Sequence, residues 1–512
     1  MKKILAAILA VLLIMSMATV SIADDAEPVS LEFFVLYPWV TNELPDPEID
    51  IYKKFFDDNF GIDMKLINSA DGDTELLSRF TAGNAPDVIQ LGGFNNLMKY
   101  YEQGVLIDDW TPYIDQLPHF LEAMGEEQQH FFTRDDKLIG LGVGAGGQQY
   151  GWMIRKDWLA NLGLAMPTNL DELYDVLYAF TYNDPDGDGE ANTYGITSAG
   201  GGSGIGELAQ LIYLLGGRDD WYVAEDGSVS HPVLDGTYKE LAEFIKKCYD
   251  GGVLDPNWYT QGWEERKSML FAGSFGMCWY PPKALLEENY AAREDEEAMN
   301  WWTVMPLFDG CAYGAQGFIG DSVLSVSMDC AADEAKMAKV VEIFDTMNPC
   351  AEDDSKYLAI VHGVDFDGYS MTRLDGGTKY MWKDVEKFPY IMRSSAEGSY
   401  IACAVYAQLF RATGFDQVET GSAPEADPYF LNKMNEFNTL MSFDRASAES
   451  KYLTIDATLS EETSMAWNEF VLNYILGVDD DYDAFVENWK IAGGDEMLES
   501  VTEQFTEWGF IG

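Results

Sequence analysis

After residue 28, the hydrophobic and polar positions alternate between short apolar runs and segments with a helical period. Apolar runs bounded by turn residues predict strands, and apolar residues at every third or fourth position predict amphipathic helices. The first five expected elements are a strand at 31–36, a helix at 48–59, a strand at 62–67, a helix at 74–82 and a strand at 87–91. This βαβαβ order is typical of a mainly parallel sheet with helices on both faces, so we predict an α/β fold.

Ligands meet such sheets at the carboxyl ends of the strands. Residues 37–39 follow the first expected strand and residues 92–96 follow the third, so both segments are expected to face a ligand. A glycine-dense stretch at 137–147 comes before the next apolar segment. Glycine allows a chain to bend and to pass between two bodies, so we place the first crossing between domains there.

Residues 184–195, here called the aspartate loop, carry carboxylates at alternate positions among glycines. Their spacing matches most of an EF-hand calcium loop, with expected ligands Asp184, Asp186, Asp188, the backbone carbonyl of Glu190, and Asn192. The twelfth position, where a bidentate Glu normally closes the site, is Gly195. A helix is expected before the loop at 169–180, with Thr168 or Asn169 as its cap, and a strand after it at 194–197. We therefore expect a structural calcium site in a larger α/β domain; the alternative is an acidic turn that binds no ion.

Residues 198–206, here called the glycine loop, lie between that strand and a helix expected at 207–215. The loop resembles a phosphate cradle in composition. It has no G-x-x-x-x-G-K-[S/T] motif, no correctly spaced G-x-G-x-x-G motif and no G-x-S-x-G motif. We interpret it as a loop on the ligand side of the sheet and not as a nucleotide site.

Composition and charge narrow the function classes. The 512 residues are 47% hydrophobic and 14% aromatic, which is typical of well-packed globular domains. The formal net charge of −55 makes nucleic acid an implausible partner. Six cysteines, with no C-x-x-C pair, form no zinc or redox motif. Cys330 and Cys350 are one conceivable disulfide, and buried free thiols are the equal alternative.

The N-terminus has the pattern of an export signal. Lys2 and Lys3 precede an apolar run, and small residues precede Asp24, so residues 1–23 are expected to be a signal peptide. No cysteine follows the run to accept a lipid, so we expect an exported protein, extracellular or periplasmic, that is not a lipoprotein. The alternative is an uncleaved membrane anchor. No other apolar run is long enough to span a membrane, so no stable membrane insertion is expected after cleavage.

The order and spacing of several segments resemble one family across nearly the whole mature chain. These segments are 80–88, 101–109, 154–168 running into the aspartate loop, and 485–495. The chain is similar to the type 2 extracellular solute-binding proteins, family 1, of carbohydrate ABC transporters. The resemblance implies two α/β lobes, each a mainly parallel sheet flanked by helices, with a ligand cleft between them and a calcium site at the aspartate loop. Members of this family often carry an acidic pair late in that loop, where this chain has Asn192 and Thr193.

The resemblance also implies a domain organisation and a function. The first lobe would comprise residues 28–146 plus about 307–370, and the second residues 147–306 plus about 371–512, including the aspartate loop. The protein would be a monomeric, non-catalytic receptor that captures a carbohydrate, an oligosaccharide, by lobe closure. It would then deliver this ligand to the permease subunits of an ABC transporter.

Sugar sites pair flat aromatic rings with polar side chains, so the cleft candidates are aromatic or polar residues at strand ends and in loops. They are Trp39, Phe94, Asn95, Tyr150, Trp152, Trp221, Trp263, Trp279, Tyr280, Asp321 and Arg411. Gln148 and Gln149 are weaker polar candidates. Each aromatic residue could instead belong to a core, and each polar one to an ordinary surface loop.

Two rival functions remain open at this point. A binding protein of the same architecture could take peptides or another solute. A secreted glycoside hydrolase would also use a cleft, aromatic rings and paired carboxylates. Adjacent acids such as Glu264–Glu265 and Asp353–Asp354 are expected by chance among 87 acidic residues, and the four histidines lie in no catalytic motif. The sequence therefore favours binding over catalysis.

Overall fold

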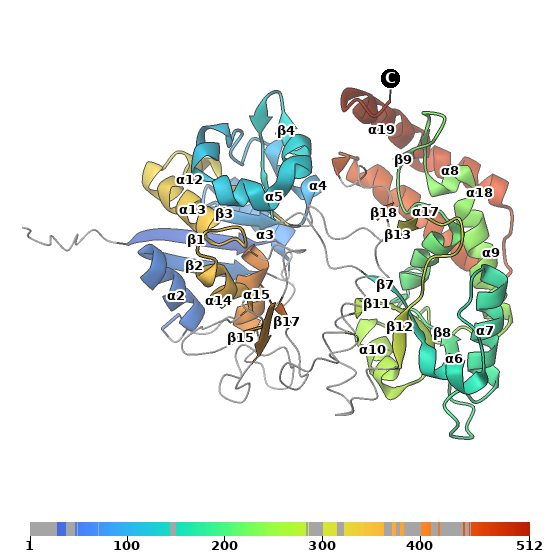
Figure 1. The fold of residues 1–512 in the computed structure, drawn as a ribbon. Coiled ribbons are helices and arrows are strands. Elements are labelled where there is room, and N and C mark those ends of the chain that lie inside the picture. Colours follow the sequence, from blue (N-terminus) through green and yellow to red (C-terminus); the bar gives the residue numbers. More distant parts are fainter. Residues whose placement is uncertain are drawn as a thin grey trace, which may run out of the picture.

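The structure is a computed structural model of the chain. It describes residues 28–36, 47–48, 50–69, 71–143, 150–282, 285, 301–314, 322–362, 371–374, 379–382, 401–410, 418–419, 444–445, 450 and 452–511. These residues form two α/β lobes, each built around its own sheet (Figure 1). The predicted fold class is confirmed. No helix in the described part of the chain is long and apolar enough to cross a membrane.

The first lobe contains a five-stranded sheet of order β2-β1-β3-β14-β6. Its strands are β1 (Val29–Val35), β2 (Ile62–Asn68), β3 (Val88–Leu91), β6 (Leu141–Gly142) and β14 (Val323–Val326). Its helices are α2 (Ile51–Phe60), α3 (Gly72–Ala82), α4 (Phe94–Tyr101), η1 (Thr111–Gln116), α5 (Pro118–Phe131), α12 (Met328–Ala331), α13 (Glu334–Thr346), α14 (Ser355–His362) and α15 (Ile401–Phe410). A hairpin of β4 (Thr133–Arg134) and β5 (Lys137–Leu138) follows α5.

The second lobe contains a four-stranded sheet of order β12-β7-β11-β8. Its strands are β7 (Gly151–Arg155), β8 (Tyr194–Ile196), β11 (Phe275–Tyr280) and β12 (Trp302–Val304). Its helices are α6 (Lys156–Leu162), α7 (Leu170–Tyr182), η2 (Gly206–Leu215), α8 (Pro232–Asp235), α9 (Thr237–Asp250), α10 (Trp263–Ala272), α17 (Ala457–Ile475), α18 (Tyr482–Trp489), η7 (Lys490–Gly494) and α19 (Asp495–Glu507). Short strand pairs complete the description: β9 (Tyr222–Val223) with β10 (Val229–Ser230), β13 (Tyr313–Gly314) with β18 (Asp444–Arg445), and β16 (Lys379–Trp382) with both β15 (Met371–Leu374) and β17 (Val418–Glu419).

In each sheet, one strand runs against the others. β14 is antiparallel to β3 and β6, and β7 is antiparallel to β11 and β12. Each is the first strand of its sheet after the chain arrives from the other lobe. Only residues 143–150 separate the end of β6 from the start of β7. β7 must therefore begin at the edge of the second sheet where the other strands of that sheet end. This entry point explains why these two strands are reversed.

Local sequence signals account for the first elements of each lobe. In α2, the Asp50 carboxylate accepts hydrogen bonds from the amides of Tyr52 and Lys53, and the helix ends at Gly61 with a φ of +64°. Such N-caps and left-handed glycine ends are the usual limits of helices. Asn169 caps α7 through the amide of Glu172, which settles the choice between Thr168 and Asn169. The segment expected as a helix at 207–215 is instead the 3₁₀ helix η2.

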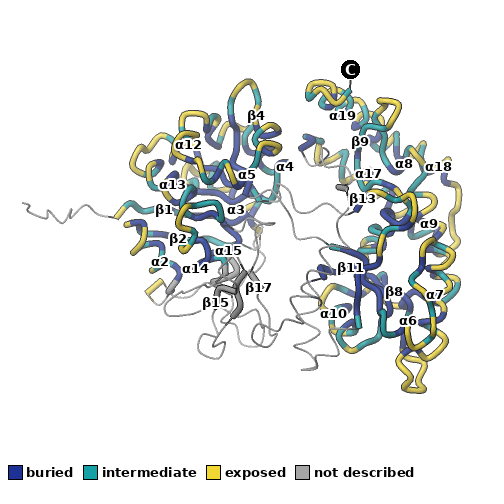
Figure 2. Tube along the Cα trace, in the orientation of Figure 1, coloured by how far each residue is buried: buried dark blue, intermediate teal, exposed yellow. Residues whose placement is uncertain are grey.

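Two large hydrophobic cores lie beneath the two sheets, and Figure 2 shows buried residues concentrated on the strands and the inner helix faces. Helix α15 contributes Tyr406, Leu409 and Phe410 to the first core, whereas the sequence analysis placed this segment in the second lobe. Met305 and Phe308 belong to the second core, so the return to the first lobe begins after the position expected near residue 307. The exact lobe limits remain a prediction.

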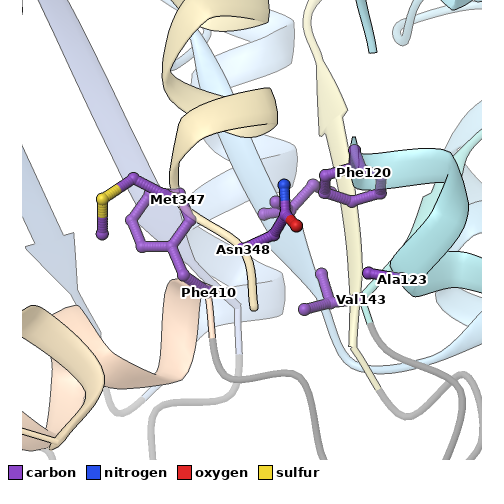
Figure 3. Close-up of a pocket in the computed structure, with 7 residues that line it drawn as sticks. Phe120, Ala123, Val143, Met347, Asn348 and Phe410 are labelled. Atoms are coloured by element: carbon purple, nitrogen blue, oxygen red, sulfur yellow. The ribbon is translucent and has the colours of Figure 1, made fainter. Parts of the chain in front are cut away.

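A small cavity lies inside the first lobe, between α5, α15 and the end of α13 (Figure 3). It is lined by Phe120, Ala123, Val143, Leu324, Met347, Asn348 and Phe410. The Asn348 side chain donates to the carbonyl of Asp345 at 2.7 Å and accepts from the amide of Cys350 at 2.9 Å. With its one polar side chain already hydrogen-bonded, the cavity is a packing gap in the core.

Candidate functional site

The carboxyl ends of β8 and β11 and the start of β7 meet at one edge of the second sheet, here called the carboxyl edge. Trp152 on β7 pairs with Trp279 on β11, and their rings lie 5.5 Å apart. Tyr150, just before β7, is only partly buried, and its ring is nearly parallel to that of Trp279 at 6.3 Å. The Trp152 indole N–H donates to the carbonyl of Gln210 at 3.0 Å, which fixes its orientation. The edge therefore presents ordered aromatic rings.

A second aromatic group lies at the same edge. Tyr280 is the last residue of β11, and Trp263 is the first residue of α10. Their rings are stacked 5.4 Å apart with an interplanar angle of 11°. Tyr280 is buried, whereas the Trp263 indole is 38% exposed. A large exposed aromatic ring with a rigid backing suits contact with the apolar face of a ligand ring.

Behind these rings lies a polar group that the sequence analysis missed. The Arg266 guanidinium is 4.2 Å from the Trp263 ring centre, and its Nη2 donates to Glu207 Oε1 at 3.0 Å. Glu207 in turn accepts from the Ser198 hydroxyl and the Ala199 amide. Arg266 lies between acidic residues and lysine on what looks like a surface helix, so no local signal indicated that it is buried.

A buried polar network ends β8 at the same edge. Asp255 is fully buried and accepts from the Thr197 hydroxyl at 2.9 Å. The Gln261 amide nitrogen donates to Thr197 Oγ1 and to the Ser198 carbonyl. These contacts join residues about 60 positions apart and fix the path of the chain as it leaves the strand. They explain the shape of the edge and were not indicated by any motif.

The corresponding edge of the first lobe is polar and carries small residues. Gly92 and Gly93 follow β3, and the Asn96 side chain donates to the Gly92 carbonyl at 2.6 Å. Asn95 is exposed at the start of α4. Gln90 donates to the Ser322 hydroxyl at 2.8 Å, at the start of β14. Asn95 is thus placed where the side chain can meet a ligand.

Five predicted cleft residues are buried members of the cores: Trp152, Trp279 and Tyr280 at the carboxyl edge, and Phe94 and Trp221 elsewhere. Phe94 is 3% exposed and packs edge-on against Phe132 at 5.1 Å. Trp221 is 1% exposed and packs on Trp489 and His231 beneath the C-terminal helices. Tertiary packing covers both of these rings, and a ligand-facing role for them stays a prediction. Trp39, Asp321, Arg411, Gln148 and Gln149 lie outside the described residues.

The aspartate loop brings its three carboxylates together. Ligand atoms of Asp184, Asp186 and Asp188 all lie within 4.8 Å of one another, and the three residues are exposed. The Gly189 amide donates to the Asp184 carboxylate at 3.2 Å, and the Glu190 amide donates to Asp188 Oδ1 at 2.7 Å. Although Asp186 is exposed as a residue, partial desolvation of its carboxylate and the neighbouring charge of Asp188 raise its pKa above the ordinary value.

The donor set of this loop suits a hard divalent cation. All three side chains offer carboxylate oxygens, which calcium prefers, and none of them forms an ion pair with a described lysine or arginine. Asn192 is close enough for its side-chain amide to donate to Asp188 Oδ2 at 2.9 Å. The described residues hold no other cluster of three acidic, histidine or cysteine ligands.

The glycine loop, in contrast, has no free cradle of amides. Every backbone amide from residue 199 to residue 204 donates within the protein, to Glu207 or to carbonyls of the loop and of residues 258–261. A phosphate needs such amides unpaired. The loop is therefore a packed turn at the carboxyl edge, and its amides from residue 199 to residue 204 are not available to bind a phosphate.

One carboxylate of each pair considered for hydrolysis accepts a backbone hydrogen bond at the start of a helix. Glu265 is exposed and accepts from the Gly262 amide at 3.2 Å, and Asp353 accepts from the Ser355 amide at 3.2 Å. His231 caps α8, and burial lowers its pKa to about 3. The five cysteines in the described part of the chain are free thiols, and burial raises the pKa of Cys248, Cys278 and Cys330 to about 12.

Comparison with known families identifies the class of protein. Residues 46–336, more than half of the chain, match the family described as bacterial extracellular solute-binding protein. The chain belongs to this family. Its members and relatives are binding proteins and not enzymes.

Individual relatives extend this result over the whole chain. The polygalacturonan/rhamnogalacturonan-binding protein YtcQ of Bacillus subtilis is 23% identical over 465 residues, which cover 88% of this chain and 86% of that protein. An extracellular solute-binding protein from Bifidobacterium longum subsp. infantis has a TM-score of 0.69 at 16% identity, covering 94% of this chain and 98% of that one. The EF-hand mutant of the Streptococcus pneumoniae substrate-binding protein FusA, in complex with fructo-nystose, has a TM-score of 0.66 at 17% identity, covering 94% and 99%. These structures show the two-lobed fold of solute-binding proteins.

Proposed function

We propose that this solute-binding protein captures a carbohydrate, an oligosaccharide, between its two lobes and delivers it to an ABC transporter permease. The observation that carries the proposal is that two aromatic rings at the edge of the second sheet, Trp263 and Tyr150, are partly exposed. Sugar rings have apolar faces that pack on such rings and hydroxyl rims that bind polar side chains such as Asn95. The ligands named for two relatives, polygalacturonan/rhamnogalacturonan for YtcQ and fructo-nystose for FusA, support the same ligand class.

Binding requires no covalent step. The sugar first packs on the rings of one lobe, and contacts with the other lobe then favour the closed arrangement. The first crossing between the lobes lies between β6 and β7, and the return lies between β12 and β14. The limits of the lobes, at about 28–146 plus 307–370 and 147–306 plus 371–512, are part of this proposal, with α15 moved to the first lobe and Phe308 kept in the second.

A structural calcium ion in the aspartate loop is also part of the proposal. Asp184, Asp186 and Asp188 would hold it through their carboxylates, with Glu190 contributing a backbone carbonyl and Asn192 completing the set. The mutual approach of the three carboxylates and the raised pKa of Asp186 fit a cation at this position. When bound, the ion neutralises the carboxylates and links the end of α7 to the start of β8. The term EF-hand in the name of the FusA variant supports a comparable loop in that relative.

The family and the N-terminal sequence indicate where in the cell envelope or outside it the protein acts. We propose that residues 1–23 are a cleaved signal peptide and that the mature protein acts outside the cytoplasm as a monomer. The signal segment lies outside the described residues. The family description as extracellular supports export, and the absence of a lipid-accepting cysteine after the apolar run favours a form that is not a lipoprotein.

A thermal-shift and calorimetry panel tests the proposed function. The mature protein is titrated with fructo-, malto-, xylo- and chito-oligosaccharides, oligogalacturonides and a mixture of short peptides. One carbohydrate class should raise the Tm of the protein. At a ligand concentration of 100 times Kd, binding adds about 2.7 kcal/mol to the free energy of unfolding. Trp263→Ala should weaken that binding about tenfold. Binding of peptides alone would favour the peptide alternative, and release of shorter sugars on incubation would favour a hydrolase.

A further inference from the structure

Arg266 is the most unusual buried charge in the described part of the chain. Its side chain is 1% exposed, yet it lies directly under the most exposed ring of the carboxyl edge. Its Nη2 pairs with Glu207, whereas its Nε and Nη1 are buried without a hydrogen-bond partner among the described residues. Burying unpaired guanidinium donors is unfavourable, and an apolar side chain could fill the same space. A charged residue in this position therefore needs an explanation beyond stability.

The distances among the three side chains show how Trp263 is held. The guanidinium carbon is 4.2 Å from the Trp263 ring centre and 5.4 Å from that of Tyr280, and the two rings are 5.4 Å apart. If Arg266 and Tyr280 lay on opposite faces of the indole, van der Waals contact of about 3.5 Å on each side would separate them by about 7 Å. They are closer than that, so they do not cover opposite faces of the indole. The 38% exposure of Trp263 leaves ring surface free for a ligand.

Glu207 connects this arrangement to the rest of the edge. One of its oxygens accepts from Arg266, and the other accepts from the Ser198 hydroxyl at 3.0 Å and the Ala199 amide at 2.6 Å. Glu207 thereby connects the guanidinium under the indole to the backbone of the glycine loop. Lysine could replace the charge but not the flat surface that packs on the ring.

We propose that Arg266 and Glu207 form a positioning pair that holds Trp263 as a platform for a sugar ring and ties it to the glycine loop. The proposal rests on the proposed function, because it names how the sugar-facing ring is fixed. Neither residue contacts the sugar. They act by keeping the exposed surface of the indole in one orientation before the sugar arrives, which reduces the ordering cost of binding.

The same lobe contains a matched control. Arg155 is also buried, lies 4.3 Å from the Trp158 ring centre and forms an ion pair with Asp157. It ends β7, at the edge of the sheet opposite to the one where β7 begins. Arg155→Met should therefore lower stability in the way that Arg266→Met does, without affecting the aromatic platform.

The test measures Kd by calorimetry for the sugar of the panel that binds wild type most tightly. Arg266→Met, Arg266→Lys and Glu207→Gln should each weaken binding about tenfold, and Arg155→Met less than twofold. Adding Arg266→Met to Trp263→Ala should cause no further loss, because the pair acts through the ring. Fluorine NMR of fluorotryptophan-labelled protein, with the Trp263 signal assigned by its loss in Trp263→Phe, should show that signal shifted or broadened in Arg266→Lys and unchanged in Arg155→Met.

The outcomes separate this inference from the proposed function. If no carbohydrate binds wild type, the proposed function fails first. If a carbohydrate binds and Trp263→Ala weakens it, but the folded Arg266→Lys and Glu207→Gln variants bind as wild type does, only the positioning pair is refuted. Equal losses of affinity in the Arg266 and Arg155 variants would also refute it, because they would indicate a general effect of stability. Arg266→Lys and Glu207→Gln keep the test decisive if Arg266→Met does not fold.

Discussion

The aspartate loop and the glycine loop flank the same short strand, β8, and both are rich in glycine, yet they are opposite in their hydrogen bonding. In the aspartate loop, three carboxylates approach one another with no described basic partner. In the glycine loop, six consecutive amides are all bonded inside the protein. The aspartate loop therefore has carboxylate oxygens available to bind a cation, whereas the six amides of the glycine loop are all already hydrogen-bonded. Glycine content indicates where a chain turns, whereas unpaired polar groups indicate where it can bind.

The largest expected difference between the two loops is the response to calcium. Adding calcium to chelated protein should raise the free energy of unfolding by about 2.7 kcal/mol at 100 times the Kd, because only the folded loop gathers the carboxylates. Thermal unfolding with EDTA and with calcium measures this. Asp186→Asn should remove most of the response, and Gly200→Ala in the glycine loop should retain it. Identical unfolding curves in EDTA and in calcium would eliminate the ion.

The second expected difference concerns packing. A methyl group at Gly200 would lie 2.5 Å from the Gly204 carbonyl oxygen and 2.7 Å from that of Tyr259, so Gly200→Ala should cost about 2–3 kcal/mol. Gly189 in the aspartate loop has open space around it, and only its φ of +81° opposes a side chain. Gly189→Ala should cost about 1 kcal/mol. Urea unfolding of both variants in EDTA gives the comparison, and a larger loss at Gly189 would contradict this reading of the loops.

The smallest expected difference is a reversal in pH dependence. Partial desolvation and the charge of Asp188 raise the pKa of Asp186, so the folded loop without calcium holds a proton more tightly than the unfolded chain. Its stabilising contribution is therefore complete below the ordinary Asp pKa of 3.8 and is lost as pH rises through the higher folded value. With calcium the sign reverses, because the ion requires ionised carboxylates.

Thermal unfolding between about pH 3.5 and 6 should show this reversal as a difference between wild type and Asp186→Asn. In EDTA, the Tm of wild type relative to the variant should fall as pH rises. In calcium it should rise. A Tm difference between wild type and variant that is independent of pH in both conditions would show that the pKa of Asp186 is not raised in the folded protein.

Much of the first lobe could be predicted from local patterns. The strand expected at 62–67 is β2 and the helix expected at 74–82 is α3, with limits that differ by one or two residues. The family and the fold class are also confirmed, because they depend on the order of such segments. The 3₁₀ helix η2 and the packing of α15 on the first lobe were not predictable, since both depend on contacts with distant parts of the chain.

The candidate site was predictable in kind but not in detail. The sequence identified Trp152, Trp263, Trp279 and Tyr280, which the structure brings to one edge with only Trp263 exposed. It also identified Phe94 and Trp221, which the structure buries elsewhere. Nothing in the residue type distinguishes an exposed ring from a covered one. Arg266 and Glu207 were missed because they are 59 positions apart and meet only when α10 packs beside η2.

The sequence by itself determined the α/β alternation, the solute-binding family and the spacing of the aspartate loop, because each is written in the period or order of nearby residues. Tertiary structure alone decided how far Trp263 is exposed, which amides of the glycine loop are used, and which strand of each sheet is reversed. These depend on the burial and pairing of groups far apart in the chain. Burial and pairing are properties of the packed molecule, and a local pattern does not contain them.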